Sequence, residues 1–400
     1  MRSLRPMLAA FPLLLAPWFS PLAHATDPPP PGPGVSPEWN ARLRYEHVDD
    51  DAFGPDANAT TLRLRLGLRF RFGAGWSALV EGEGTASAGD DYNSGANGRI
   101  AYPVIADPEG AELNQAWLDW KAEKLHATLG RQRLQFDNQR WIGNSGWRQF
   151  EQTFDALAFD ATLAPGLTAR YAWLDQVNRV NGDDAIDPLA RKRELDTHLF
   201  DLAWKHGIAQ IVGYAYLHDD KDVATASTAS YGVRAVTDAV RDGRGWGLAL
   251  ELAEQHEYAS NPLSFSHRYW LLEPSLTHAG VTWRAGWEHL GGNGQHSLQT
   301  PLATLHVFNG WADKFNTTPP GGLEDRYLSA GGKFGGKYDW VLAWHDYEAD
   351  TGGDYGSEWN ASFGFPVYGP VKGLLKLADY RADGFARDTT KAWVQMEWAH

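Results

Sequence analysis

The feature that most constrains the fold of this chain is the way its connections alternate in length. Segments of alternating polarity are joined by tight turns, such as Gly73-Ala74-Gly75, and by longer polar loops, such as 87–111, 136–154 and 291–323. A transmembrane β-barrel has short turns at one rim and long loops at the other. A soluble β-sandwich has no reason to alternate its loop lengths in this way. The sequence therefore predicts an all-β fold, a transmembrane antiparallel β-barrel with short periplasmic turns and long extracellular loops.

Eighteen segments have alternating polar and apolar residues, the period of a β-strand. An even number of strands places both chain ends at the periplasmic rim. The predicted strands are 39–47, 62–72, 76–86, 112–121, 125–135, 155–163, 167–176, 197–205, 209–218, 230–237, 246–257, 267–277, 281–290, 324–334, 338–348, 357–365, 371–382 and 390–400.

The N-terminal residues have the pattern of an export signal. Arg2 and Arg5 precede a short apolar stretch that is followed by Ala23-His24-Ala25, a signal-peptidase pattern. We expect residues 1–25 to be a cleaved signal peptide, residues 26–38 to be a proline-rich periplasmic lead-in, and residues 39–400 to be the barrel. The predicted location is the bacterial outer membrane.

The composition agrees with this class and excludes others. The 19 tryptophans are typical of aromatic girdles at two membrane interfaces, and the absence of cysteine excludes a disulfide framework. A formal net charge of −14 in an exported chain argues against a nucleic-acid partner. The sequence contains no nucleophile-elbow or His-Glu-x-x-His motif, so we expect no enzymatic activity, no cofactor and no metal ligands.

The segment Leu62–Phe72 is the sharpest functional signal. Its four arginines alternate with leucine or phenylalanine, so all four project from one face of a strand. In a membrane barrel the apolar face meets lipid, and the polar face lines the lumen. The preceding and other strands add arginines to their polar faces, and the predicted lumenal set is Arg42, Arg44, Arg63, Arg65, Arg69, Arg71, Arg170 and Arg284. Arginine rings select anions, and the guanidinium fork matches carboxylate geometry.

Two glutamates on the next strand limit this interpretation. A tight turn at Ala74 sets Glu83 opposite Arg65, and Glu81 projects from the same face, so part of the lumenal surface is a ladder of mixed sign. The arginines either select anions or only hold the barrel together. The acidic residues of the outer loops are either solvated loop charge or sites where divalent cations bridge to lipopolysaccharide.

One strand conflicts with the lipid-facing rule. In 125–135 the apolar face continues into Arg131 and Arg133, and arginine is costly near the middle of a bilayer. A bulge at Gly130 would move these side chains to the other face.

Several blocks make the chain similar to a known family, the alginate export family of outer-membrane porins. The blocks are Asn114–Trp120, Leu129–Leu134, Asp137–Gly143, Trp147–Gln149, Gln152–Ala156, Asn309–Phe315 and Leu323–Asp325. The resemblance implies an eighteen-stranded monomer with an arginine-rich lumen that is gated by loops folding inward. It also implies that Arg131 and Arg133 belong to the conducting surface, and that loops 136–154 and 291–323 fold over or into the pore.

The predicted function is a channel for anionic solutes, foremost the export of an anionic polysaccharide such as alginate. Lumenal arginines would attract carboxylates, Tyr380 and Trp393 would stack on sugar faces, and periplasmic export components would drive transport. The expected partners are the polymer, outer-membrane lipid and lipopolysaccharide, and the barrel assembly machinery. The alternatives are a diffusion porin for small organic anions and, from another class, an outer-membrane hydrolase with its site on the outer loops.

Overall fold

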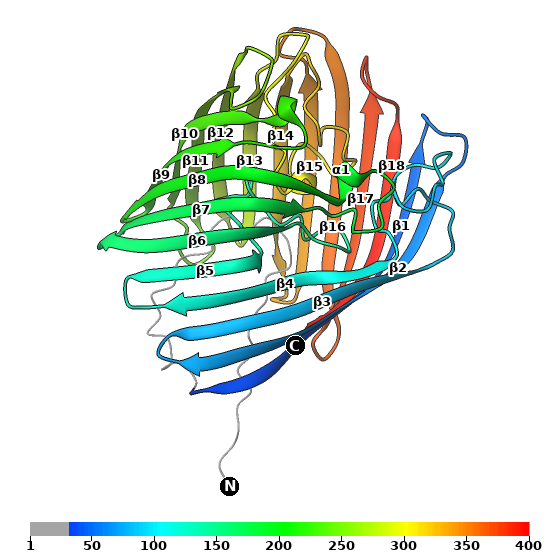
Figure 1. Cartoon of the computed structure of the whole chain (residues 1–400). Helices are drawn as coiled ribbons and strands as arrows, with labels where there is room; N and C mark the ends of the chain where they lie inside the picture. The colour runs from blue at the N-terminus through cyan, green and yellow to red at the C-terminus, as the bar shows by residue number, and fades with distance from the viewer. Residues whose placement is uncertain (1–31, 400) are drawn as a thin grey trace.

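The chain forms a closed barrel of eighteen antiparallel strands (Figure 1). The computed structural model describes residues 32–399. Each strand pairs with the next along the chain, and β1 pairs with β18 to close the sheet. The strands are β1 (Gly34–Asp50), β2 (Ala57–Gly73), β3 (Trp76–Ala88), β4 (Gly110–Lys121), β5 (Leu125–Gln132), β6 (Thr153–Ala164), β7 (Leu167–Asn178), β8 (Lys192–His206), β9 (Ala209–His218), β10 (Thr228–Asp238), β11 (Gly245–Glu257), β12 (Ser266–His278), β13 (Val281–Leu290), β14 (Leu323–Phe334), β15 (Tyr338–Glu348), β16 (Asp354–Tyr368), β17 (Val371–Ala382) and β18 (Thr389–Ala399).

Helical structure within residues 32–399 is confined to single turns in the loops. These are α1 (Pro188–Arg191), η1 (Ala224–Ala226) and η2 (Leu305–Val307). No helix in this part of the chain is long and apolar enough to cross a membrane.

The predicted fold class is confirmed, and each of the eighteen predicted segments corresponds to one strand. Several strand ends differ by up to five residues from the predicted ones, and β1 begins at Gly34, inside the segment predicted as the lead-in. Pro37 has no N–H to donate, but β1 pairs with β18 only from Asn40 onward, so Pro37 lies where one side of the strand has no neighbour. The predicted signal peptide and the first residues of the lead-in lie outside the described residues.

The alternation of connections is confirmed as well. The tight turns include 74–75, 165–166 and 279–280, whereas the longest loops, 89–109, 133–152 and 291–322, all lie at the opposite rim. Asn40 near the start of β1 pairs with Ala399 at the end of β18, so the barrel starts and ends at the rim of tight turns (Figure 1). In an outer-membrane barrel this is the periplasmic rim.

The exposure pattern of β2 shows which face meets lipid. Leu64 is 43% exposed, whereas the neighbouring Arg63 is fully buried. The apolar side chains of β2 therefore point outward and its arginines point into the barrel, the orientation of a membrane barrel and the reverse of a soluble one.

Long loops of the extracellular rim fold into the lumen. Trp141 and Trp147 of loop 133–152, and Phe315 of loop 291–322, belong to one buried cluster with lumenal side chains of the strands. The expectation that these loops fold into the pore is confirmed.

Candidate solute pathway

Four arginines of β1 and β2 form an upper basic cluster in the barrel, which consists of Arg42, Arg44, Arg63 and Arg65. Arg42 lies directly opposite Arg63 across the two strands, and all four side chains are buried. Like charges so close together repel one another, so the cluster requires hydrogen-bond acceptors and carboxylates around it.

Loop 133–152 supplies many of the acceptors through its backbone. Arg42 Nη1 donates to the carbonyl oxygens of Gly146 and Trp147, both at 3.1 Å. Arg44 Nη2 donates to the Trp147 carbonyl at 2.6 Å, and the Arg44 guanidinium lies 4.0 Å from the centre of the Trp147 ring. The loop therefore covers the arginines that the sequence placed in an open lumen.

The same loop also covers Arg63 and Arg65, the two arginines of the cluster that belong to β2. Arg63 Nη1 and Arg65 Nη2 donate to the Gln149 carbonyl at 3.5 and 3.4 Å. Gln149 in turn donates from Nε2 to Thr61 Oγ1 of β2 at 2.7 Å. Residues 146–149 thus lie along β1 and β2 as a strip bound by guanidinium groups.

Carboxylates balance the charge of the cluster. Glu397 of β18 lies 3.2 Å from both Arg42 and Arg63. Arg65 pairs with Glu83 at 2.6 Å and with Glu151 of the loop at 3.3 Å. The predicted register, with Glu83 directly opposite Arg65, is confirmed.

Arg133 continues this network where β5 ends. Its guanidinium lies 3.0 Å from Glu81 and forms a short ion pair with Glu151. Burial works to raise the pKa of Glu151, but the nearby charges of Arg133 and Arg65 lower it to about 2. Glu151 is therefore ionised and ties the loop to both arginines.

Arg131 is on the other face of the barrel. β5 pairs with β4 and β6 without a register shift, so the predicted bulge at Gly130 is wrong, and Arg131 shares the outward face of Leu129. Its guanidinium pairs with Asp155 at 2.7 Å. The register shifts occur in flanking strands, one of them between Glu81 and Gly82 of the β3–β4 pair. Arg131 does not join the lumenal arginines.

Gly130 nevertheless has an unusual backbone. Its φ is +120°, and a Cβ there would lie 2.3 Å from the carbonyl oxygen of Ala116. The position requires glycine because the neighbouring strand approaches so closely.

A second group of arginines lies nearer the periplasmic rim. On β2, Arg69 pairs with Glu38 at 2.5 Å and lies over the Trp117 ring, and Arg71 donates to Ser36 Oγ at 3.0 Å. Arg69 is about one-third exposed. These two arginines follow the upper basic cluster along β2, but they contact residues of β1 and β4 in place of loop 133–152.

Two more arginines lie near the periplasmic rim, Arg170 on β7 and Arg284 on β13. Arg170 pairs with Asp160 at 2.5 Å, and Arg284 lies 3.8 Å from Glu273. Arg284 borders a cavity of about 220 Å³ near the turns 239–244 and 279–280. The cavity is also lined by Thr237, Asp238, Glu273, Ser275 and Thr282. The periplasmic mouth is therefore polar and of mixed sign.

An acidic surface, which the sequence analysis did not identify, faces the lumen on β11 to β16. It consists of Glu251, Glu273, Glu288, Asp325 and Glu358, all buried. Period two already placed Glu251 and Glu288 on the polar faces of their strands. The alternation of the strands therefore indicated lumenal glutamates, but the sequence did not show which loop residues bind them.

Both inserted loops bind the acidic surface. Arg140 pairs with Glu288 at 3.0 Å. Trp141 Nε1 donates to Glu251 at 2.8 Å, and Asn309 Nδ2 of loop 291–322 donates to Glu288 at 2.7 Å. Loop 133–152 thus spans the lumen, with its carbonyl groups on the basic cluster and its donor groups on the acidic surface.

The residues predicted to stack on sugars are enclosed. Trp393 is 1% exposed and packs against Trp147, with ring centres 5.7 Å apart. Tyr380 is fully buried, and its hydroxyl donates to the Phe385 carbonyl at 2.9 Å. In this conformation both rings contact loop residues and not the open lumen.

Solved structures support the fold. OccK9 (OpdG) of Pseudomonas aeruginosa superimposes with a TM-score of 0.74 at 14% identity, covering 91% of this chain and 98% of that one. OpdO of the same organism gives 0.71 at 15% identity over 92% and 97%. The outer membrane protein OpdK, also from P. aeruginosa, gives 0.70 at 13% over 91% and 98%.

The sequence comparisons are more specific about the family. No curated protein matches the chain. The family model described as alginate export matches residues 36–253, which is more than half of the sequence. With its closed eighteen-stranded barrel, arginine-bearing lumen and inserted loops, this chain belongs to the alginate export family.

Proposed function

We propose that this outer-membrane channel passes anionic solutes, and that its main solute is an anionic polysaccharide such as alginate moving outward. The observation that carries the proposal is the line of arginines on β1 and β2, which runs from Arg71 near the periplasmic rim to Arg44 under loop 133–152. A polymer arriving from the periplasm meets Arg71 and Arg69 before it reaches the loop.

The loop contacts suggest how the solute opens the path. The N–H groups of Arg42 and Arg44 that a carboxylate would bind now donate to uncharged carbonyl groups of residues 146–148. Hydrogen bonds from guanidinium to carboxylate are stronger than those to neutral acceptors. Carboxylates of the solute therefore compete with the loop for the same donors and displace it.

The paired glutamates fit the same proposal. A channel conducts only if its sites bind the solute weakly enough to release it. Glu83, Glu397 and Glu38 partly neutralise the arginines beside them, which weakens each site while leaving several sites in a row. In this proposal the protein is a monomeric channel, not a hydrolase, and periplasmic components deliver the polymer.

A diffusion porin for small organic anions is the second candidate. OpdK, a barrel of this shape, has a crystal structure with vanillate, a small aromatic carboxylate. The cavity of about 220 Å³ beside Arg284 is also of the size of a small solute and not of a polymer.

Single-channel recording in a planar bilayer under a KCl gradient, followed by addition of polymannuronate, tests the proposal. We expect an anion-selective reversal potential and a polymer block that weakens in Arg65→Ser and Arg69→Ser. Arg131→Ser is the matched control, because Arg131 lies on the outer face, and its block should equal that of the unmodified channel. Cation selectivity, or a block insensitive to both lumenal changes, would overturn the proposal. A block by small carboxylates without one by polymer would establish the second candidate.

A further inference from the structure

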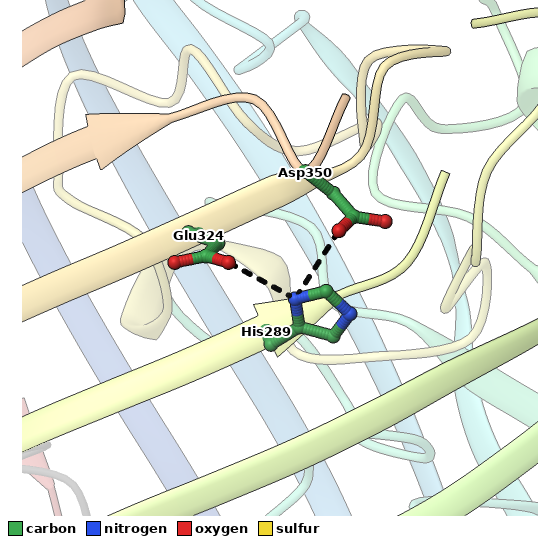
Figure 2. Close-up of side chains that lie close together, drawn as sticks. All are labelled: His289, Glu324 and Asp350. Atoms are coloured by element: carbon green, nitrogen blue, oxygen red, sulfur yellow. Dashed lines mark ion pairs between the residues drawn. The ribbon is translucent and has the colours of Figure 1, made fainter. Parts of the chain in front are cut away.

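Three potential metal ligands lie together on the outer face of the barrel near the extracellular rim. His289 is at the end of β13, Glu324 is opposite it at the start of β14, and Asp350 follows β15 in loop 349–353 (Figure 2). His289 continues the outward face of Trp287, whereas Glu288 between them points into the lumen. The three ligands therefore lie outside the solute pathway.

The geometry of the three ligand atoms leaves room for an ion between them. His289 Nδ1 lies 3.6 Å from Glu324 Oε1 and 3.9 Å from Asp350 Oδ1, and all three atoms are within 4.8 Å of one another. Ligands bound at about 2.1 Å in a tetrahedral site are about 3.4 Å apart. Shortening the two distances from His289 Nδ1 by a few tenths of an ångström, together with a closer approach of the two carboxylate oxygens to each other, would give these atoms that spacing.

His289 lacks the hydrogen bond that a buried imidazole normally makes. Its side chain is only 12% exposed, and Nδ1 is buried without a hydrogen-bond partner among the described residues. Figure 2 shows Nδ1 directed between the two carboxylates. A buried polar atom without a partner is costly, and a metal ion at this position would satisfy it.

Surrounding groups orient the carboxylates toward the histidine. Glu324 Oε2 accepts from Trp287 Nε1 at 3.1 Å and from Arg326 Nη2 at 3.0 Å, and Asp350 Oδ2 accepts from the Gly292 N–H at 3.0 Å. In each carboxylate the second oxygen is held elsewhere, so Oε1 and Oδ1 face Nδ1. Outer contacts of this kind fix the ligands of protein metal sites.

Stacking fixes the imidazole as well. The His289 ring lies parallel to Trp270, with centres 5.4 Å apart and an interplanar angle of 9°. The ring cannot turn away from the carboxylates without losing this contact.

We propose that His289, Glu324 and Asp350 bind one divalent transition-metal ion such as Zn²⁺. An imidazole nitrogen with two carboxylates suits zinc, whereas magnesium and calcium prefer oxygen ligands alone. Three protein ligands leave a fourth position for water. The charge of Arg326, on the far oxygen of Glu324, makes the site weaker than one with unopposed carboxylates.

The ion would also connect elements at the base of loop 291–322. Asp350 holds the Gly292 N–H at one end of this loop, and the Thr351 N–H donates to the Gly321 carbonyl at the other end, at 3.0 Å. Metal binding to Asp350 therefore fastens the base of the loop to β13 and β14.

Isothermal titration of ZnCl₂ into the chelator-treated full-length barrel, in detergent and without a histidine tag, tests the site. We expect one Zn²⁺ per chain that a hundredfold excess of Mg²⁺ does not displace. His289→Ala and Asp350→Asn should each weaken binding at least tenfold. The matched control is His296→Ala, which breaks the contact between His267 and His296 at the same rim and should leave the affinity unchanged.

Several outcomes would overturn the site. These are the absence of binding, equal affinity in His289→Ala, loss of binding in His296→Ala, or displacement by Mg²⁺. Heat-dependent migration in gel electrophoresis shows that each variant is folded, and Glu324→Gln is a second variant if His289→Ala fails to fold. Because the site is on the outer face, its failure would leave the solute pathway untouched.

Discussion

Replacing Arg65 tests whether loop 133–152 is held in the lumen by its charged contacts. Arg65 is buried and makes three contacts, to Glu83 at 2.6 Å, to Glu151 at 3.3 Å and to the Gln149 carbonyl at 3.4 Å. Two of these three partners belong to the loop. Arg65→Ser removes the cation and leaves both carboxylates behind.

The magnitude follows from these contacts. Removing one partner of a buried ion pair costs about 3–5 kcal/mol. Glu151 keeps its pair with Arg133, and water can enter the lumen, so we expect about 1.5–3 kcal/mol of this to be lost from loop docking. Since 1.4 kcal/mol is a factor of ten, the equilibrium between docked and released loop shifts by about 10- to 100-fold.

Single-channel recording measures this shift as open probability. The matched control is Arg69→Ser, because Arg69 is on the same face of the same strand but pairs with Glu38 and not with the loop. We expect Arg65→Ser to raise the open probability at least tenfold and Arg69→Ser to leave it unchanged. An open probability for Arg65→Ser within twofold of the unmodified channel, or an equal rise in both variants, would refute the idea that these contacts close the pore.

Three further predictions follow from burial, backbone and charge. Leu64→Arg, on the lipid-facing side of β2, should lower the free energy of unfolding of the barrel in liposomes by about 2–4 kcal/mol, measured by denaturant unfolding. A decrease no larger than that of Leu64→Ala would contradict the lipid-facing assignment. Gly130→Ala should cost about 1–3 kcal/mol in the same assay, whereas Gly213→Ala, where a Cβ meets no atom within 4 Å, should be neutral or stabilising. Because neighbouring arginines lower the pKa of Glu151 to about 2, loop docking should be complete above about pH 4.3 and lost as the pH falls toward 2. Near-UV circular dichroism follows that release, and release above pH 5 would contradict it.

Much of the barrel could be predicted because its determinants are local. Period two places Leu64 outside and Arg65 inside whatever the rest of the chain does. A tight turn sets the register of the two strands that it joins, which is why the pair of Arg65 and Glu83 was predicted correctly.

Arg131 shows where this reasoning needs the neighbouring strands. The charge of Arg131 on an apolar face suggested a bulge, but the residue is balanced by Asp155 on β6, near the end of β5 where the chain leaves the sheet. Arginine on the lipid side is much less costly near the interface than at the bilayer middle. Arg133, two residues later, lies beyond the end of β5 and reaches Glu81 in the lumen.

The sequence by itself determined the number of strands, the two faces of the barrel and the lumenal place of the arginines on β1 and β2, because strand period and turn length are read from adjacent residues. Only the tertiary structure decided which of those arginines are covered. Arg44 binds the backbone carbonyl of Trp147, more than a hundred positions away, and Trp141 donates to Glu251 across a similar separation. Every residue type has a carbonyl group, so no pattern in the sequence marks the loop residues that bind the arginines. Their positions depend on how the closed barrel brings the loop against its inner surface.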